Sequence, residues 1–524
     1  MIAGAVHDLA ASQPAPSAPF DACIIGAGAA GSYLAKRLSG LGMRVALVEA
    51  GGLRCAPEVS DCFRPEFGEA VYSGATLGRA FGLGGSTSRW GALLAPHSEV
   101  DAVPGGDSVG GWSRLVGEVR RCAPTVLRGL GWRGELDFER LWRAPSTLPE
   151  SIRASDELSA VEALFLPFRR KNLAWLVESA RGGSGGGSIE IFVNAVVARW
   201  AVRTVGVDQP VVESIEARHA RGNAVRIVAR NFILAAGALE STRSMLELRE
   251  SLPEGALRGA DSIGRGLGDH LSVSIGDFRG QELAEAKRQF GPVFAGSWMR
   301  TSRLLAARRS SEEPRSFTHV IFDYQSPAFL VAKECLQALQ ARRAPRVSAA
   351  DAIRGIGGLA RMAWERFAHA RLHLGLDCEA HLQLDLEQTV SDRNRVLLSD
   401  GPLDSVGRRS MRIDWAIRES DLSAIDLLRE RYLHAWARNP DLPRVEPRPL
   451  DLMATKPHDA YHPVGTLRMG SGDDAVVDCE LETRGLPRLF VVSTAVFPSA
   501  GTANPTFSML CLAEALAQRL ARTG

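Results

Sequence analysis

The stretch that most constrains the fold lies between Asp21 and Glu49. An apolar run at residues 21–25 is long enough for a buried strand, and Gly26-Ala27-Gly28-Ala29-Ala30-Gly31 follows it directly. Apolar residues at helical spacing come next, and residues 43–48 form a second candidate strand that ends at Glu49. A G-x-G-x-x-G turn between strand and helix, with an acid about 20 residues later, is typical of a dinucleotide-binding βαβ unit.

Each glycine of this turn has a physical role. Gly26 permits the tight turn, Gly28 lets the backbone approach a pyrophosphate, and Gly31 lets helix and strand pack closely. The helix that begins here offers free N–H groups to the phosphates. Glu49 is placed to bind an unphosphorylated ribose. The predicted cofactor-binding residues of this unit are Gly26, Gly28, Ala29, Ala30, Gly31, Glu49 and Ala50.

A second glycine-rich segment covers residues 78–91. Such dense glycines let backbone amides lie against a flat ligand, and Trp90 could form one wall of the pocket around that ligand. This segment, together with Gly51 and Gly52 after the acid, favours FAD over NAD. Taken by itself, a mobile surface loop would explain the segment equally well. Its predicted cofactor-binding residues are Arg79, Gly84, Gly85, Ser86, Trp90 and Gly91.

The candidate catalytic residues lie near the other end of the chain. His462 is a group that can exchange protons near neutral pH, and Asn504 precedes Pro505 and an apolar helical pattern at residues 507–520. Proline is tolerated at a first helical position, and the free N–H groups behind it carry partial positive charge. Alternatively, His462 is a structural histidine and Asn504 a helix cap.

Together these segments resemble the glucose–methanol–choline (GMC) oxidoreductases, a family of FAD enzymes that oxidise alcohols. The resemblance also rests on later segments in the same order, namely residues 232–241, 264–270, 387–388, 394–396 and 413–415. It implies an α/β fold in which a Rossmann-type FAD-binding domain is interleaved with an α+β substrate domain on a mostly antiparallel sheet, the p-hydroxybenzoate-hydroxylase-like architecture.

The resemblance assigns the general base to His462 and substrate positioning to Asn504. Because Arg89 stands where some relatives carry a flavin-linked histidine, it implies non-covalent FAD. Ser493 stands where the family often has an Asp, which puts that contact in doubt. His270 is expected to be structural, and Glu387 to be either near the active site or on the surface. The further cofactor-binding residues that it implies are Val197, Ala236, Gly237, Ser493, Thr494, Ala495, Pro505 and Thr506.

The expected domain boundaries follow from these assignments. We expect a disordered N-terminus at residues 1–19, FAD-binding segments at 20–270 and 461–524, and a substrate-binding domain at 271–460. Alternating residues 381–387 predict a strand with one wet face. Residues 396–398 and 411–415 are expected to be its neighbours.

Composition excludes several classes of function. A net charge of +2, from 62 Lys and Arg against 60 Asp and Glu, gives no electrostatic case for a nucleic-acid partner. No apolar stretch is long enough to span a membrane, and the start of the chain does not resemble a secretory signal. The eight cysteines lack the spacing of metal ligands, so we expect no metal, reduced thiols and a cytoplasmic protein.

Two helical patterns at residues 329–341 and 349–373 carry arginines beside apolar faces. They could form a basic amphipathic surface that touches a membrane or a redox partner. We expect instead that they cover the substrate domain and expose solvated arginines, because Asp351 and Glu365 dilute the charge. The arginines concerned are Arg342, Arg343, Arg346, Arg354, Arg361, Arg366 and Arg371.

The predicted function is oxidation of a small-molecule alcohol by a dehydrogenase or an oxidase, with a sugar or polyol as the preferred substrate class. The electron acceptor is left open between oxygen, a quinone and a separate redox protein, since the chain has no CxxCH haem motif. One alternative is a hydroxynitrile-lyase-like enzyme that keeps FAD without using its redox power. The other is an NAD-dependent dehydrogenase of ordinary Rossmann type.

Overall fold

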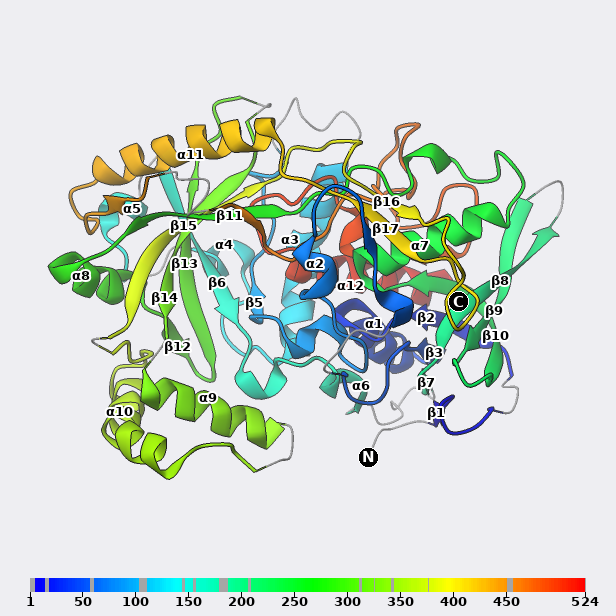
Figure 1. Cartoon of the computed structure of the whole chain (residues 1–524), viewed down its shortest axis with the longest axis horizontal. Coiled ribbons are helices and arrows are strands. Elements are labelled where there is room, and N and C mark those ends of the chain that lie inside the picture. Colours follow the sequence, from blue (N-terminus) through cyan, green and yellow to red (C-terminus); the bar gives the residue numbers. More distant parts are fainter. Residues whose placement is uncertain are drawn as a thin grey trace.

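The structure is a computed structural model of the chain, in which two large sheets lie side by side (Figure 1). It describes residues 5–14, 18–56, 61–102, 111–143, 147–153, 157–178, 187–205, 209–310, 313–324, 326–340, 344–375, 377–449 and 456–523. Each sheet forms the centre of a separate large hydrophobic cluster.

The first sheet is built on a parallel core, in the order β1-β7-β3-β2-β10-β9-β8, with β20 also paired to β10. Its parallel strands are continuous apolar runs buried on both faces, as parallel sheets require. β8 and β9 extend β10 as an antiparallel ribbon. The strands are β1 (Val6–Asp8), β2 (Phe20–Ile25), β3 (Arg44–Val48), β7 (Ser188–Val193), β8 (Val196–Val205), β9 (Gln209–Arg218), β10 (Ala224–Leu234) and β20 (Leu489–Val491).

Helices from distant parts of the sequence pack with this sheet. α12 packs against both α1 and α3, so the last helix lies beside the first (Figure 1). The buried Glu514 carboxylate on α12 accepts hydrogen bonds from Tyr33 and Arg37 on α1, which fixes the two helices together. The helices are α1 (Ala29–Gly40), α2 (Ser73–Thr76), α3 (Gly111–Leu130), α4 (Phe138–Leu141), α6 (Trp175–Glu178), α7 (Gly237–Glu250) and α12 (Thr506–Thr523).

The second sheet is antiparallel, in the order β18-β11-β15-β14-β13-β6-β5, with β12 paired to β13 and β19 to β11. The strands are β5 (Leu93–Leu94), β6 (Leu158–Phe165), β11 (His270–Asp277), β12 (Val293–Ala295), β13 (Trp298–Ala306), β14 (Ser316–Asp323), β15 (Glu379–Glu387), β18 (Glu446–Pro447) and β19 (His458–Asp459).

Helix α11 runs along one side of this sheet, and α9 and α10 form a hairpin at another side (Figure 1). The buried Tyr432 on α11 accepts a hydrogen bond from the backbone N–H of Ala306 on β13, which holds the helix to the sheet. The helices around this sheet are α5 (Glu150–Arg153), α8 (Gly280–Phe290), α9 (Pro327–Gln340), α10 (Ala349–Ala368) and α11 (Glu419–Ala437). This arrangement of a Rossmann-type sheet and a mostly antiparallel sheet confirms the predicted fold class.

The segments of the two sheets alternate along the chain more often than the sequence indicated. β5 and β6 lie between residues 20 and 270, yet both belong to the second sheet. We expected β16 (Arg395–Leu398) and β17 (Met411–Asp414) to be neighbours of β15, and this prediction was wrong. They form a separate three-stranded sheet with β4 (Glu66–Phe67). Strand pairing between distant segments decides both points, and hydrophobic alternation carries no information about it.

Three further expectations need correction. Residues 6–8 form β1 and Leu9 is fully buried, so the N-terminus is ordered in this stretch because it adds an edge strand to β7. The polar face of β15 is not exposed to solvent at Asp385 and Glu387, because both side chains are buried in the interior. On α10, large apolar side chains and not only arginines are exposed, so this helix does not simply cover the substrate domain.

Candidate active site

A cavity of about 570 Å³ lies where segments of the first sheet and the C-terminal region meet. The glycine turn after β2, the end of β3, the residues after β10 and the segments around His462 and Asn504 all contribute to its walls. The cavity lies at the carboxyl ends of parallel strands, where α/β sheets bind ligands. The sequence-predicted residues that line it are Gly26, Gly28, Ala29, Ala30, Glu49, Ala50, Arg79, Gly85, Ser86, Trp90, Gly91, Val197, Ala236, Gly237, His462, Thr494, Asn504, Pro505 and Thr506.

The glycine turn has the geometry that its sequence predicted. Gly26 adopts a φ of 100°, and a Cβ there would lie 2.7 Å from the carbonyl oxygen of Ala235. A Cβ on Gly31 would lie 1.8 Å from the carbonyl oxygen of Gly26, so only glycine allows α1 to approach β2 this closely. A Cβ on Gly28, in contrast, would meet nothing within 4 Å. Gly28 therefore leaves space at the cavity wall, whereas the other two glycines allow the backbone to pack.

Glu49 stands just beyond β3 and closes the turn from the other side. Its carboxylate oxygens accept hydrogen bonds from the backbone N–H groups of Ala27, Gly51 and Gly82 at 2.8–2.9 Å. Burial raises the pKa of Glu49, and these three donors oppose the rise by stabilising the charged form. The carboxylate thus joins both glycine-rich segments, and about one of its four lone-pair sites remains for a donor in the cavity.

The second glycine-rich segment is held rigidly. A 3-10 helix covers Gly85–Ser88, and Trp90 donates through its indole nitrogen to the carbonyl of Lys171 at 2.8 Å. Arg79 pairs with Glu240 of α7 at 2.9 Å. The segment is therefore an ordered wall of the cavity and not a free surface loop.

Four predicted cofactor-binding residues are not among those that line the cavity: Gly31, Gly84, Ser493 and Ala495. Gly84 has a φ of 88°, and a Cβ there would collide with Asn172. The Ser493 hydroxyl caps the short 3-10 helix Thr494–Val496 by accepting from the backbone N–H of Ala495 at 3.3 Å. These residues shape the backbone around the cavity.

The proton positions on His462 follow from its neighbours. His270 Nε2 lies 2.9 Å from the carbonyl oxygen of Gly501, which can only accept, so this nitrogen carries the proton. Nδ1 of a neutral His270 is then an acceptor, and it lies 3.1 Å from Nδ1 of His462. His462 must donate there, which leaves its Nε2 with a lone pair that accepts a hydrogen bond. That nitrogen lies 3.3 Å from the amide nitrogen of Asn504.

Electrostatics keeps both imidazoles neutral. The pKa of His462 is lowered to about 3 by burial and by the neighbouring His270, although the ring keeps some exposure towards the cavity. Burial also lowers the pKa of His270. At neutral pH, His462 is therefore an unprotonated base whose lone pair sits at the cavity wall.

The Asn504 side chain completes this pair. Its carbonyl oxygen is buried and has no hydrogen-bond partner. Its amide group contacts His462, so the alternative of a side-chain cap on α12 is not seen here. A buried amide oxygen without a partner is costly unless a ligand supplies a donor. The arrangement is suited to a ligand hydroxyl placed between Asn504 and His462.

Asp269 fixes the backbone that carries both histidines. It accepts hydrogen bonds from the backbone N–H groups of His270 and His462, at 2.7 and 2.9 Å, and from the hydroxyl of Tyr72. Burial raises the pKa of Asp269 to about 8, against the effect of these donors. The Asp269 carboxyl thus joins β11 to the segment that precedes Pro463.

Two buried carboxylates hold the segment that leads to Asn504. Glu387 at the end of β15 accepts from the Ser499 hydroxyl and, at 3.2 Å, from the backbone N–H of Gly501. Asp101 accepts from the backbone N–H and hydroxyl of Thr502 at 2.8 and 2.9 Å. Two carboxylates therefore fix the chain only a few residues before Asn504.

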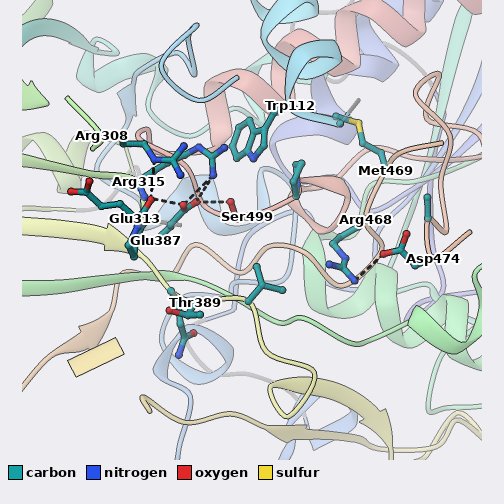
Figure 2. Close-up of a pocket in the computed structure, with 16 residues that line it drawn as sticks. Trp112, Arg308, Glu313, Arg315, Glu387, Thr389, Arg468, Met469, Asp474 and Ser499 are labelled. Atoms are coloured by element: carbon teal, nitrogen blue, oxygen red, sulfur yellow. Dashed lines mark hydrogen bonds and ion pairs between the residues drawn. The ribbon is translucent and has the colours of Figure 1, made fainter. Parts of the chain in front are cut away.

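Arg315 forms an ion pair with Glu387 (Figure 2). Its guanidinium pairs with Glu387 at 3.1 Å and stacks over the ring of Trp112 at 4.7 Å. Burial acts to raise the pKa of Glu387, but Arg315 and the neighbouring donors outweigh it and lower the pKa. A smaller cavity of about 320 Å³ opens beside this group. The ion pair keeps Glu387 charged, so that it remains an acceptor for Ser499 and Gly501.

The sequence did not indicate that His270, Asp269, Tyr72 and Asp101 support the site. His270 was expected to be structural, yet its imidazole contacts that of His462. Glu387 was left open, and it lies in the interior against the segment that leads to Asn504. The polar alternation along β15 and the resemblance at residues 387–388 were the signals for Glu387. Residues 264–270, which include Asp269 and His270, entered the resemblance without a role at the site, and no local pattern marked Tyr72 or Asp101.

Comparison with known proteins agrees with this geometry. Residues 390–513 match the family model described as GMC oxidoreductase. The fold is similar to pyridoxine 4-oxidase from Mesorbium loti, at 18% identity and a TM-score of 0.56, over 95% of this chain and 98% of that one. Residues 390–513 of this chain thus resemble the GMC oxidoreductase family, and the likeness to pyridoxine 4-oxidase concerns the fold alone. The predicted resemblance is therefore confirmed.

The fold also resembles a variant formate oxidase of Aspergillus oryzae RIB40, a structure that concerns FAD modification. The identity is 16% and the TM-score 0.55, over 97% of this chain and 99% of that one. By sequence, C-glycoside 3-oxidase of Microbacterium trichothecenolyticum is 30% identical over 28% of this chain and 27% of its own length. Oxygen-dependent choline dehydrogenase of Chromohalobacter salexigens is 44% identical over 12% of this chain and 11% of its own. The matched parts thus span about a quarter or less of these curated relatives.

The described residues give two further findings. None of their helices combines the length and apolar character needed to cross a bilayer. No group of three or more His, Cys, Asp or Glu side chains among them is arranged to hold a metal ion.

Proposed function

We propose that this protein is an FAD-dependent oxidoreductase that oxidises the CH–OH group of an alcohol, with His462 as general base. The observation that carries the proposal is the lone pair on His462 Nε2, beside Asn504, in the cavity that the glycine turn also lines. A base at one end and a dinucleotide turn at the other are the two parts that such a reaction needs.

The cavity wall fits FAD. Open space at Gly28 admits a phosphate group against the backbone, and Glu49 retains about one lone-pair site for a ribose hydroxyl. The segment at residues 78–91, with Thr494, Pro505 and Thr506, would hold the flavin ring. When bound, FAD supplies an acceptor for the hydride from the alcohol carbon. Arg89 lines the cavity where a flavin-linked histidine would stand, which supports non-covalent FAD.

The chain's own residues would then orient the alcohol and take its proton. His462 Nε2 accepts the hydroxyl proton as the C–H bond breaks, because its pKa leaves it unprotonated at neutral pH. The Asn504 amide donates to the alcohol oxygen and restricts its orientation, which lowers the entropic barrier. The N-terminus of α12, at Thr506, places partial positive charge at the cavity wall and would stabilise negative charge there.

For the substrate we propose a sugar or another polyol. The Trp90 segment and the His462–Asn504 pair resemble those of family members that oxidise sugars, and part of the chain is similar to C-glycoside 3-oxidase. A non-redox lyase would leave the base in the same place, but no feature of the cavity favours it. Oxygen, a quinone or a separate redox protein would serve as acceptor.

The test is to follow the visible spectrum of the purified flavoprotein anaerobically while sugars, aliphatic alcohols, aromatic alcohols and sterols are added in turn. We expect one class to bleach the flavin band in the wild type and not in a His462→Ala variant that retains FAD. Equal bleaching of the variant would refute the role of His462. A protein that purifies without FAD and cannot take it up would refute the whole proposal.

A further inference from the structure

The hairpin of α9 and α10 stands at the edge of the second sheet, away from the first sheet (Figure 1). Two arginines fix its C-terminal end. Arg366 stacks over Phe294 at 3.8 Å and donates to the carbonyl of Gly296, and Arg371 donates to the carbonyl of Arg288 at 2.6 Å. The hairpin is thus a firmly attached projection whose outer side is free to meet another surface.

Helix α10 packs on α9 through its smallest residues. A Cβ on Gly355 would lie 3.5 Å from the backbone of Ala328, and one on Gly358 would lie 2.5 Å from the Ala328 methyl group. Ala328 and Val331 of α9 are buried at this contact. The inner face of α10 therefore contains glycine, and a bulkier residue at position 358 would push the helices apart.

Four bulky apolar side chains lie on the opposite face of α10. At about 100° per residue, the four positions Ile353, Ile356, Trp364 and Phe367 fall within a stripe of roughly 80°, about half a turn from the glycines. Their exposed fractions are 70%, 62%, 65% and 85%. Apolar residues normally face the core of a helical protein, so this orientation is reversed. Contiguous exposed apolar surface of this kind marks an interaction site.

Charge identifies the kind of surface that this face would meet. Residues 327–373 contain eight Lys and Arg against three Asp and Glu, a net charge of +5 in a chain whose total is +2; Arg342 and Arg343 of this count lie outside the described residues. On α10 itself, Arg361 and Arg354 are exposed on one flank of the apolar stripe, and Arg354 also pairs with the half-exposed Asp351 at 3.0 Å. A basic flank beside an apolar stripe with tryptophan and phenylalanine is typical of helices that lie in a membrane interface.

We propose that this outer face of α10 docks onto the surface of a bilayer rich in anionic lipids. The apolar stripe enters the boundary between headgroups and acyl chains, and the arginines bind the lipid phosphates. A helix of 20 residues is about 30 Å long and lies parallel to the membrane plane, so no span is required. A second copy of the chain is a poorer occupant, because symmetric packing brings like-charged arginine flanks together. The proposal is independent of the chemistry in the cavity.

The test is co-sedimentation of the purified protein with vesicles of phosphatidylcholine, with or without one third phosphatidylglycerol. We expect binding to the anionic vesicles that weakens as salt rises. The triple variant Ile356→Ser, Trp364→Ser, Phe367→Ser should bind at least roughly a hundredfold more weakly, because three apolar side chains no longer enter the interface. The variant Arg354→Gln, Arg361→Gln should lose about 10- to 30-fold on the anionic vesicles only.

A matched control is the double variant Leu403→Ser, Leu427→Ser, which removes two exposed leucines on other elements and should bind like the wild type. Absence of binding to anionic vesicles at low salt would overturn the proposal. Unchanged binding of the triple variant would also overturn it. A wild-type dimer in solution that the triple variant converts to a monomer would assign the face to a second copy instead.

Discussion

Replacement of His270 by Phe isolates the effect of one proton position on His462. The ring volume is largely kept, but the acceptor that lies 3.1 Å from His462 Nδ1 is lost. A buried N–H without a partner costs about 1–3 kcal/mol. The His462 ring can avoid this cost by moving its proton to Nε2, the nitrogen that must accept the substrate proton. The substitution therefore favours the unproductive form by the same amount.

This energy converts directly into a rate. With about 1.4 kcal/mol for each factor of ten, the productive form becomes roughly 5- to 150-fold rarer. We expect the first-order rate of flavin reduction by a saturating alcohol to fall by that factor in an anaerobic stopped-flow experiment. FAD content and substrate affinity should change little, because His270 is not among the residues that line the cavity.

The matched control is His381→Phe on the neighbouring strand. Glu387 is the strand partner of His270, and His381 lies six residues from Glu387 along β15. His381 is therefore about 20 Å from His270. Its substitution should leave the reduction rate within twofold of wild type. If His270→Phe also stays within twofold while His462→Ala abolishes reduction, the argument from the proton position is wrong.

Further predictions concern pH, the glycine turn and the ion pair behind the site. Because the pKa of His462 is about 3, this group stays neutral as pH falls from 8 to about 5. The rate of flavin reduction should therefore not decrease with a midpoint near pH 6.5. Such a decrease in the wild type, if it were absent from a His462→Gln variant, would contradict this prediction. Gly28→Ala should fold normally and lose FAD affinity, whereas Gly31→Ala should lower the melting temperature even without FAD; a reversed result would refute the packing argument. Glu387→Gln should destabilise the protein by about 3–5 kcal/mol in denaturant unfolding, because it leaves the charge of buried Arg315 with the longer contact to Asp101 at 3.9 Å, and a loss below 1 kcal/mol would contradict this.

The sequence was most informative where structure depends on local chemistry. The glycine turn, Glu49 and the flanking elements are contiguous, so their spacing alone predicted the βαβ unit. The two catalytic candidates, His462 and Asn504, came from a resemblance, and their contact at 3.3 Å depends on how distant segments meet. The role of each remains a proposal.

Pairing between distant segments accounts for what the sequence did not predict. Alternation along β15 showed that Asp385 and Glu387 share a face, but not that this face would be buried. The contact between His270 and His462 joins residues 192 positions apart, and neither segment carries a signal for the other. For α10, the helical period separated an apolar stripe from Gly355 and Gly358, but only the packing on α9 shows which side faces outward.

The strand order of the second sheet also sets limits on recombination between relatives. Because β5 and β6 precede β11 by a long stretch of chain and pair into the same sheet, no single crossover can exchange that sheet as a unit. A chimera made by replacing residues 271–460 would join β13 of one parent to β6 of another, at an eight-residue antiparallel ladder. Functional chimeras therefore require β5 and β6 to be exchanged together with the later strands.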